Sequence, residues 1–251
     1  MIHSFLLVGQ SNMAGRGFAH EVEPIHNPRI KVLRNGRWQP MYVPVNPDRP
    51  FSGVNLAESF ADLYARDHDV EVGLIPCADG GTRIAQWEEG GLLFDNALYQ
   101  AELASRTSTI AGVLWHQGEA DSFEDRWPCY AEKLAGVLDA LRSRLQLHDV
   151  PFVLGGLGDF LALRNDPGLR SLHYLKINEA IQAYVHSRDM TGFAPATGLE
   201  SNPDHLHFCA KALREFGARY YEAFRKLEDP DKVFEEKEHP DLAVRNWMEN
   251  L

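Results

Sequence analysis

The chain has 251 residues, 44% of them hydrophobic, and a formal net charge of −11 at pH 7. This length can bury a substantial core in one large α/β domain, and the hydrophobic fraction excludes an intrinsically disordered chain. The acidic balance disfavours nucleic acid as a partner, because a negatively charged protein repels a phosphate backbone.

Short apolar runs recur along the chain and predict β-strands. The runs are continuously apolar rather than alternating with polar residues, which is typical of a parallel sheet covered on both faces. We predict strands over residues 5–8, 72–75, 110–115, 151–154 and 193–197.

Longer segments with helical periodicity separate these runs. Their apolar residues repeat at spacings of three and four, so that they share one face of a helix. We predict helices over residues 56–64, 98–103, 134–145, 172–185 and 213–227. Alternating strands and helices indicate the α/β class, as a three-layer α/β/α sandwich with a mainly parallel, five-stranded sheet and right-handed crossovers.

The pattern indicates one domain and a short acidic end. The chain has no internal repeat and no Gly/Ser-rich linker, so we expect residues 1–227 to form a single domain. Residues 20–52 are rich in Pro, Asn and Arg and predict a loop with a short hairpin around Asn35 and Gly36. Residues 228–251 contain eight acids and three bases, which indicates a solvated, acidic C-terminal appendage.

The cysteines and the N-terminal residues bear on the cellular compartment. Cys77, Cys129 and Cys209 form no CxxC pair, and such a sparse set is compatible with a reducing compartment. The first eight residues contain no basic segment followed by a long apolar stretch, so we expect no signal peptide and a cytoplasmic location. No apolar run approaches the ~20 residues that would span a bilayer, so we expect no membrane partner.

Polar loops with small residues follow four of the predicted strands. Ligands of open α/β sheets bind beyond the carboxyl ends of the strands, so these loops are expected to meet at one site. The loops cover residues 9–17, 76–82, 116–121 and 202–207.

Ser11, Asp204 and His207 form a candidate nucleophile, orienting acid and base. Ser11 follows the first predicted strand directly, where it would present its hydroxyl at the sheet edge or serve as a helix N-cap. A serine nucleophile needs a base, and the base needs an orienting partner. Asp204 lies three residues before His207, close enough to reach Nδ1 and leave Nε2 for the serine. Taken singly, an Asp or a His in a loop is more typical of a solvated surface than of a catalytic site.

Candidate oxyanion donors come from two other loops. Gly80 and Gly81 have no Cβ, so a backbone N–H of either could approach a ligand closely, although a tight turn explains the pair as well. Gln117 follows a predicted strand with an amide that can donate. Together with the Ser11 N–H these groups would form an oxyanion hole with three donors.

Four sequence blocks resemble the SGNH hydrolases, and in particular the branch that contains sialate O-acetylesterases and acetylxylan esterases. The most specific block is GQSNMAGRG, and the other three follow in the order of the family. The blocks are residues 9–17, 80–87 (GGTRIAQW), 115–121 (WHQGEAD) and 204–208 (DHLHF). The resemblance implies an SGNH or flavodoxin-like fold and hydrolysis of O-acetyl esters on a carbohydrate.

The resemblance also implies roles for individual residues. Ser11 would be the nucleophile, His207 the general base and Asp204 the third member of a triad, with Glu119 as the alternative third member. The oxyanion donors would be those already described, and no cofactor or metal is implied.

Several further residues are candidates for substrate binding. Asn12 belongs to the serine block, and Arg16 could contact substrate oxygens or form a structural ion pair. Trp87 and Trp38 could stack on a sugar ring or pack in the core. The sequence does not distinguish acetylated xylan from O-acetyl sialic acid, and it leaves the oligomeric state open.

Two other functions compete with the esterase. A metallohydrolase would use His116, Glu119, Asp121, His205 and His207, but no HExxH motif is present and the serine block would have no role. A carbohydrate-binding protein without catalysis on the same scaffold is the second alternative, because a fold does not fix a function.

Overall fold

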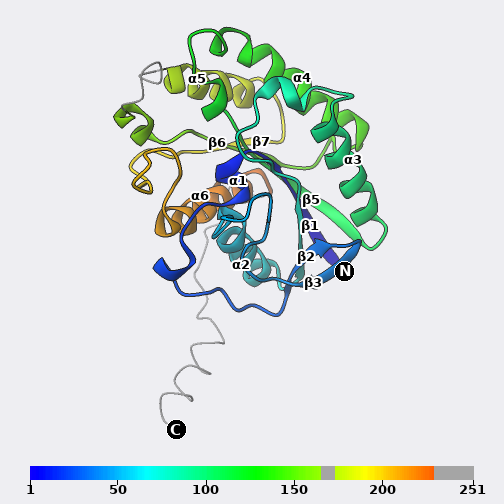
Figure 1. The fold of residues 1–251 in the computed structure, drawn as a ribbon. Helices are drawn as coiled ribbons and strands as arrows, with labels where there is room; N and C mark the ends of the chain where they lie inside the picture. The colour runs from blue at the N-terminus through cyan, green and yellow to red at the C-terminus, as the bar shows by residue number, and fades with distance from the viewer. Residues whose placement is uncertain (165–172, 229–251) are drawn as a thin grey trace.

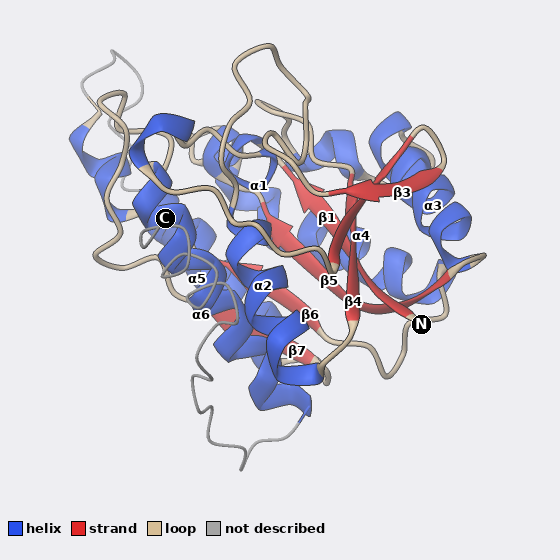
Figure 2. Ribbon diagram, turned by 90° about the horizontal axis from the view of Figure 1, so that it is seen from below, coloured by secondary structure: helices blue, strands red, loops and turns tan. Residues whose placement is uncertain are grey.

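The computed structural model describes residues 1–164 and 173–228. A central sheet is covered by helices on both faces, with α2 and α6 on one side and α3, α4 and α5 on the other (Figure 1). Figure 2 shows the strands running side by side through the middle of the molecule. This arrangement confirms the predicted three-layer α/β/α fold. No helix within the described ranges is long and apolar enough to cross a membrane.

The sheet has seven strands in the order β3-β2-β4-β1-β5-β6-β7. All neighbours are parallel except β2 and β3, which form an antiparallel hairpin. The strands are β1 (Ile2–Gly9), β2 (Ile30–Arg34), β3 (Arg37–Pro40), β4 (Glu71–Pro76), β5 (Ser108–His116), β6 (Phe152–Gly155) and β7 (Thr191–Ala194).

The prediction of five strands is wrong because the hairpin joins the main sheet. The turn at Asn35 and Gly36 was anticipated, but β2 also pairs in parallel with β4. Ile30 and Val32 are buried in this pairing, whereas the charged Lys31 between them interrupts the apolar run by which the other strands are recognised. The last strand begins at Thr191, earlier than expected, and it ends at Ala194 because Pro195 has no N–H to continue the ladder.

The five predicted helical segments all correspond to helices, most of which extend beyond the predicted bounds, and the one-turn helix α1 lies outside the predicted segments. The helices are α1 (Ser11–Ala14), α2 (Leu56–His68), α3 (Leu92–Ser105), α4 (Tyr130–Arg144), α5 (His173–His186) and α6 (Ala210–Glu228). Asn55 starts α2 with a capping box, accepting the Ala57 N–H while Glu58 accepts the Asn55 N–H. Leu172, the expected first residue of α5, and residues 229–251 of the expected appendage lie outside the described residues.

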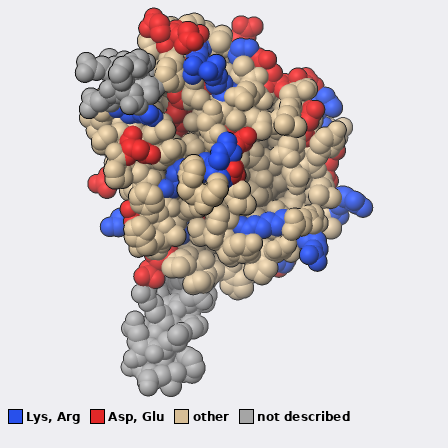
Figure 3. Space-filling model, in the orientation of Figure 1, with Lys and Arg blue, Asp and Glu red and all other residues tan. Residues whose placement is uncertain are grey.

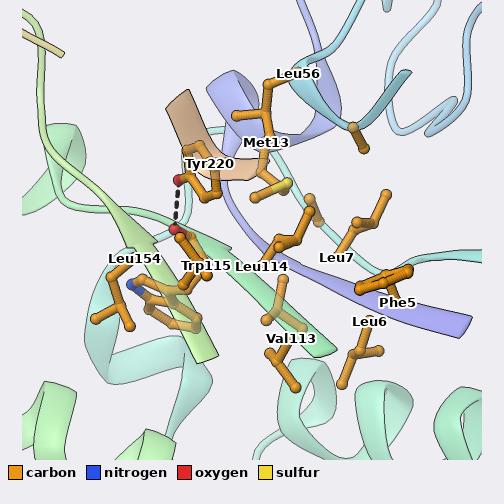
Figure 4. Close-up of a cluster of buried hydrophobic side chains, with 14 of the residues drawn as sticks. Phe5, Leu6, Leu7, Met13, Leu56, Val113, Leu114, Trp115, Leu154 and Tyr220 are labelled. Atoms are coloured by element: carbon orange, nitrogen blue, oxygen red, sulfur yellow. Dashed lines mark hydrogen bonds between the residues drawn. The ribbon is translucent and has the colours of Figure 1, made fainter. Parts of the chain in front are cut away.

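The core lies on both faces of β1 and β5. Residues 5–8 of β1 are completely buried, as their unbroken apolar run predicts. Figure 4 shows the side chains of Phe5, Leu6 and Leu7 packed against those of β5, together with Met13 and Leu56. In the same cluster the Tyr220 hydroxyl donates to the Trp115 carbonyl at 2.7 Å. This packing fixes the carboxyl end of β1, where the serine block begins.

Candidate active site

The expected loops meet around a cavity of about 410 Å³ at the carboxyl ends of the central strands. Ser11, Gly80, Gly81 and His207 all line this cavity. They come from separate sequence blocks, so the parallel sheet brings together residues that are up to 196 positions apart.

Backbone geometry at Gly9 places Ser11 at the start of the one-turn helix α1. Gly9 has φ +132°, and a Cβ there would lie 2.0 Å from the His116 carbonyl oxygen. The next residue, Gln10, donates its N–H to that same oxygen at 2.9 Å, which fixes the turn to β5. Within the described part of the chain, the Ser11 N–H has no protein acceptor, as expected of the first turn of a helix.

Ser11, His207 and Asp204 form a chain of hydrogen bonds. His207 Nε2 lies 3.0 Å from Ser11 Oγ, and His207 Nδ1 lies 2.6 Å from Asp204 Oδ2. Asp204 Oδ1 also accepts the backbone N–H groups of Leu206 at 2.9 Å and His207 at 3.0 Å. Partial burial alone would raise the pKa of Asp204, but these hydrogen bonds from His207 and the backbone outweigh it and hold the pKa well below its ordinary value.

Glu119 points to a different histidine. Its Oε1 accepts from Asn12 Nδ2 at 2.5 Å and lies 3.0 Å from His116 Nε2. Burial would raise the pKa of Glu119, but the electrostatic interaction and hydrogen bond with His116 and the hydrogen bond from Asn12 hold this pKa below the ordinary value. Of the two candidate carboxylates, Asp204 is therefore the one that contacts His207.

Asn12 does not face the cavity, contrary to its expected contact with substrate. Its side chain is completely buried and clamps the backbone on both sides of His207. Asn12 Nδ2 donates to the Leu206 carbonyl at 3.1 Å, and Asn12 Oδ1 accepts the Phe208 N–H at 3.1 Å. A residue adjacent to Ser11 thus holds the loop that carries the histidine.

The structure distinguishes the two glycines that were candidate donors. The Gly80 N–H donates to Asp48 Oδ2 at 2.8 Å and is occupied. In the described residues the Gly81 N–H has no acceptor, and Gly81 lines the cavity. Gly81, with the Ser11 N–H, is therefore the backbone donor that remains open to a ligand.

The expected role of Gln117 as a third donor is wrong for this geometry. Its amide is completely buried and does not line the cavity. Gln117 Nε2 donates to Asp121 Oδ2 at 2.6 Å and to the Thr82 carbonyl at 3.0 Å, which uses both of its hydrogens. Gln117 therefore ties the third block to the second.

Arg16 adopts the structural alternative considered for it. Its guanidinium forms a bidentate ion pair with Asp48, with Nη1 to Oδ1 at 2.9 Å and Nη2 to Oδ2 at 2.7 Å. Both side chains are only 5% exposed. Asp48 thus neutralises Arg16 at the floor of the cavity.

Neither tryptophan is placed to stack on a sugar. Trp87 is completely buried, packs edge-on against Trp115, and donates from Nε1 to Thr82. Trp38, in β3 of the hairpin, packs over Gly73 of β4 and does not line the cavity. The aromatic side chains that do line it are Phe51, which is 70% exposed, and Phe123.

Sequence reasoning missed the cavity residues that lie outside the four sequence blocks. Arg49 and Phe51 come from the Pro-rich loop before α2, Arg126 from the segment before α4 and Arg164 from the segment after β6. Of the five residues of the alternative metal site, His116 and Glu119 are in contact, but the described residues contain no group of three or more His, Cys, Asp or Glu that could hold a metal ion.

Comparison with known proteins agrees with the geometry. A family model described as carbohydrate esterase, sialic acid-specific acetylesterase, matches residues 1–226. The chain belongs to this carbohydrate esterase family. The family comprises carboxylic ester hydrolases, so the chain is assigned to that class of enzyme.

Proteins and solved structures similar to the chain align over most of its length. A probable carbohydrate esterase of Arabidopsis thaliana (At4g34215) is 27% identical over 243 residues, which cover 88% of this chain and 89% of the relative. Its crystal structure superposes with a TM-score of 0.80 over 89% of this chain and 98% of that chain. NanS, at 16% identity, has a TM-score of 0.73 over 91% of this chain and 98% of its own. A carbohydrate acetylesterase of Xanthomonas citri, at 19% identity, has a TM-score of 0.70 over 92% of this chain and 57% of its own; both of these show the shared fold.

Proposed function

We propose that the chain is a serine esterase that removes O-acetyl groups from carbohydrates through an acetyl-enzyme intermediate. The observation that carries this proposal is the hydrogen-bonded series Ser11–His207–Asp204 at the cavity, at 3.0 and 2.6 Å. Each member occupies the position that its chemical role requires: a nucleophile beside a base, and a base held by a carboxylate.

The geometry supports a two-step mechanism. Ser11 Oγ attacks the acetyl carbonyl carbon while its proton passes to His207 Nε2, and Asp204 stabilises the resulting imidazolium. The Ser11 and Gly81 N–H groups hold the negative charge on the carbonyl oxygen. His207 returns the proton to the sugar oxygen as the C–O bond breaks. Water then attacks the acetyl-enzyme by the same route and releases acetate.

The cavity lining favours an acidic sugar over a neutral one. The whole chain carries a net charge of −11, and Figure 3 shows acidic and basic side chains spread over the same face rather than gathered in one charged field. The cavity is nevertheless lined by Arg126, by Arg164 and by Arg49, which pairs with Asp79, in addition to Arg16, whose charge Asp48 offsets. Glu119 is its one acidic lining residue in the described part of the chain. A carboxylate-bearing sugar such as O-acetyl sialic acid fits this lining better than acetylated xylan.

Acetate release from defined substrates tests both parts of the proposal. O-acetyl sialic acid and acetylated xylo-oligosaccharides are given to wild type, S11A and the control S143A, in which an exposed serine of α4 is changed. We expect turnover by wild type and S143A, greater kcat/KM for the sialic acid, and none by S11A at an unchanged thermal midpoint. Turnover by S11A, or a folded wild type inactive on both, would refute the esterase; preference for the xylo-oligosaccharide would refute the acidic-sugar specificity.

A further inference from the structure

Both backbone polar groups of Gly80 are held by side chains. Asp48 Oδ2 accepts the Gly80 N–H at 2.8 Å, and Arg49 Nη2 donates to the Gly80 carbonyl at 2.9 Å. The two side chains that hold the glycines are neighbours in the loop before α2, far in sequence from both catalytic loops.

Both holding side chains are themselves anchored. Asp48 accepts two hydrogen bonds from Arg16 and one from Ser52 Oγ at 2.7 Å, and it is 5% exposed. Arg49 Nη1 lies 2.8 Å from Asp79 Oδ1 and donates to the backbone carbonyl of Asp48 at 2.7 Å. Neither group has to be ordered when a ligand arrives, so the position they impose on the glycines is present in the free protein.

The glycine pair needs such anchoring because it has little steric preference of its own. Gly81 has φ +78°, and no atom lies within 4 Å of the position that its Cβ would occupy. Two successive residues without Cβ allow the peptide plane between them to rotate at low cost. Rotation would turn the Gly81 N–H away from the site where the oxyanion forms.

The contact from Arg49 fixes the direction of that N–H through the planarity of the peptide bond. In a trans peptide the C=O of one residue and the N–H of the next lie in one plane and point in opposite directions. A guanidinium on the Gly80 oxygen therefore determines where the Gly81 N–H points. At Gly80 itself a Cβ would lie 2.4 Å from Arg16 Nη2 and 2.8 Å from Asp48 Oδ2, so only glycine allows Asp48 to approach.

We propose that Asp48 and Arg49 are positioning residues that hold Gly80 by its N–H and its carbonyl, so that the Gly81 N–H serves as an oxyanion donor. The inference rests on the proposed esterase function, since it assigns how one part of that site is preorganised. Loss of either contact should lower kcat, because an oxyanion donor stabilises the transition state and not the bound ester.

The main test compares R49Q with R49K and with the matched control R144Q, which changes an exposed arginine that pairs with Glu89 outside the cavity. The substrate is p-nitrophenyl acetate, which has no charge for Arg49 to bind. We expect R49Q to lower kcat about 10- to 100-fold, less than the ~10²–10³-fold effect of losing a whole oxyanion donor. KM should change little, R49K should recover part of kcat because an ammonium still donates to the Gly80 carbonyl, and R144Q should behave as wild type.

A second readout separates positioning from general structure. A trifluoromethyl ketone that forms a tetrahedral oxyanion adduct with the serine should bind R49Q more weakly by the same factor as kcat falls, while the thermal midpoint stays near that of wild type. D48N tests the Gly80 N–H contact independently, with the same expected pattern at temperatures below its own midpoint.

The outcomes that overturn the inference differ from those that overturn the esterase. Wild-type kcat and inhibitor affinity in folded R49Q and D48N would refute positioning, as would a defect confined to KM for acidic sugars, which would make Arg49 a substrate-binding residue. If wild type shows no turnover, or turnover that S11A retains, the proposed function itself is refuted.

Discussion

Asn12 provides the sharpest test of how the fold positions His207. Asn12→Ala removes the buried amide that bonds the Leu206 carbonyl and the Phe208 N–H, and also the hydrogen bond to Glu119. A buried polar group left without its partner costs about 1–3 kcal/mol. Two such backbone groups predict a loss of about 2–6 kcal/mol in the free energy of unfolding.

The same substitution should impair catalysis beyond its effect on stability. The lost bonds flank His207 on both sides, so the histidine is free to move relative to Ser11 Oγ. A misplacement of about 1 Å at a reacting group can cost ~10²-fold in rate. We therefore expect N12A to lower kcat/KM for p-nitrophenyl acetate by about 10²-fold under conditions in which it is fully folded.

Asn178 offers a matched control for this experiment. Its amide clamps the backbone of Leu157 in the same manner, accepting the N–H at 2.7 Å and donating to the carbonyl at 3.1 Å, but it does not line the cavity. Urea unfolding and steady-state kinetics on both variants separate stability from positioning. If N12A loses stability as N178A does but retains wild-type kcat/KM, the positioning argument is wrong.

Three further predictions concern individual titratable groups. Asp204→Asn should lower kcat/KM by about 10²–10⁴-fold, the usual contribution of acid–base catalysis. This loss should exceed that of Glu119→Gln, and equal losses in the two variants would contradict the assignment of Asp204. Because the fold lowers the pKa of Asp204, the stability that this carboxylate contributes is present above pH ~3.9 and is lost as the pH falls through the folded-state pKa. The difference in unfolding free energy between wild type and D204N should therefore shrink in acid, and a constant difference would refute this. Burial raises the pKa of the Cys77 thiol to about 12. DTNB at about pH 8 should therefore label the exposed Cys129 in the native protein and Cys77 only after unfolding. Rapid labelling of native Cys77 would contradict the structure.

The sequence was sufficient where function depends on local spacing or on strand ends. Asp204 and His207 lie within one turn of a loop, so their contact follows from their separation of three residues. Ser11 follows an unmistakably apolar strand, and parallel strands bring their carboxyl ends together. These local relations, together with the four family-like sequence blocks, indicate the series of hydrogen bonds without knowledge of the tertiary contacts.

The remaining features depend on contacts between distant segments. The choice between Gly80 and Gly81 depends on Asp48, which lies 32 residues away in a loop without a motif. Gln117 is occupied because Asp121 and Thr82 accept its hydrogens, which no spacing rule indicates. Trp87 is apolar enough for a core and broad enough for a sugar platform, so only the packing of β5 decides its burial.

The identity of the acylated residue tests the central claim most directly. Wild type and S11A are treated with a p-nitrophenyl alkylphosphonate, which forms a stable tetrahedral adduct with an active nucleophile, and the modified peptide is located by mass spectrometry. The account predicts one adduct on Ser11 in wild type, formed together with loss of esterase activity, and no adduct in S11A. An adduct on another residue, or activity lost in wild type without modification of Ser11, would contradict it.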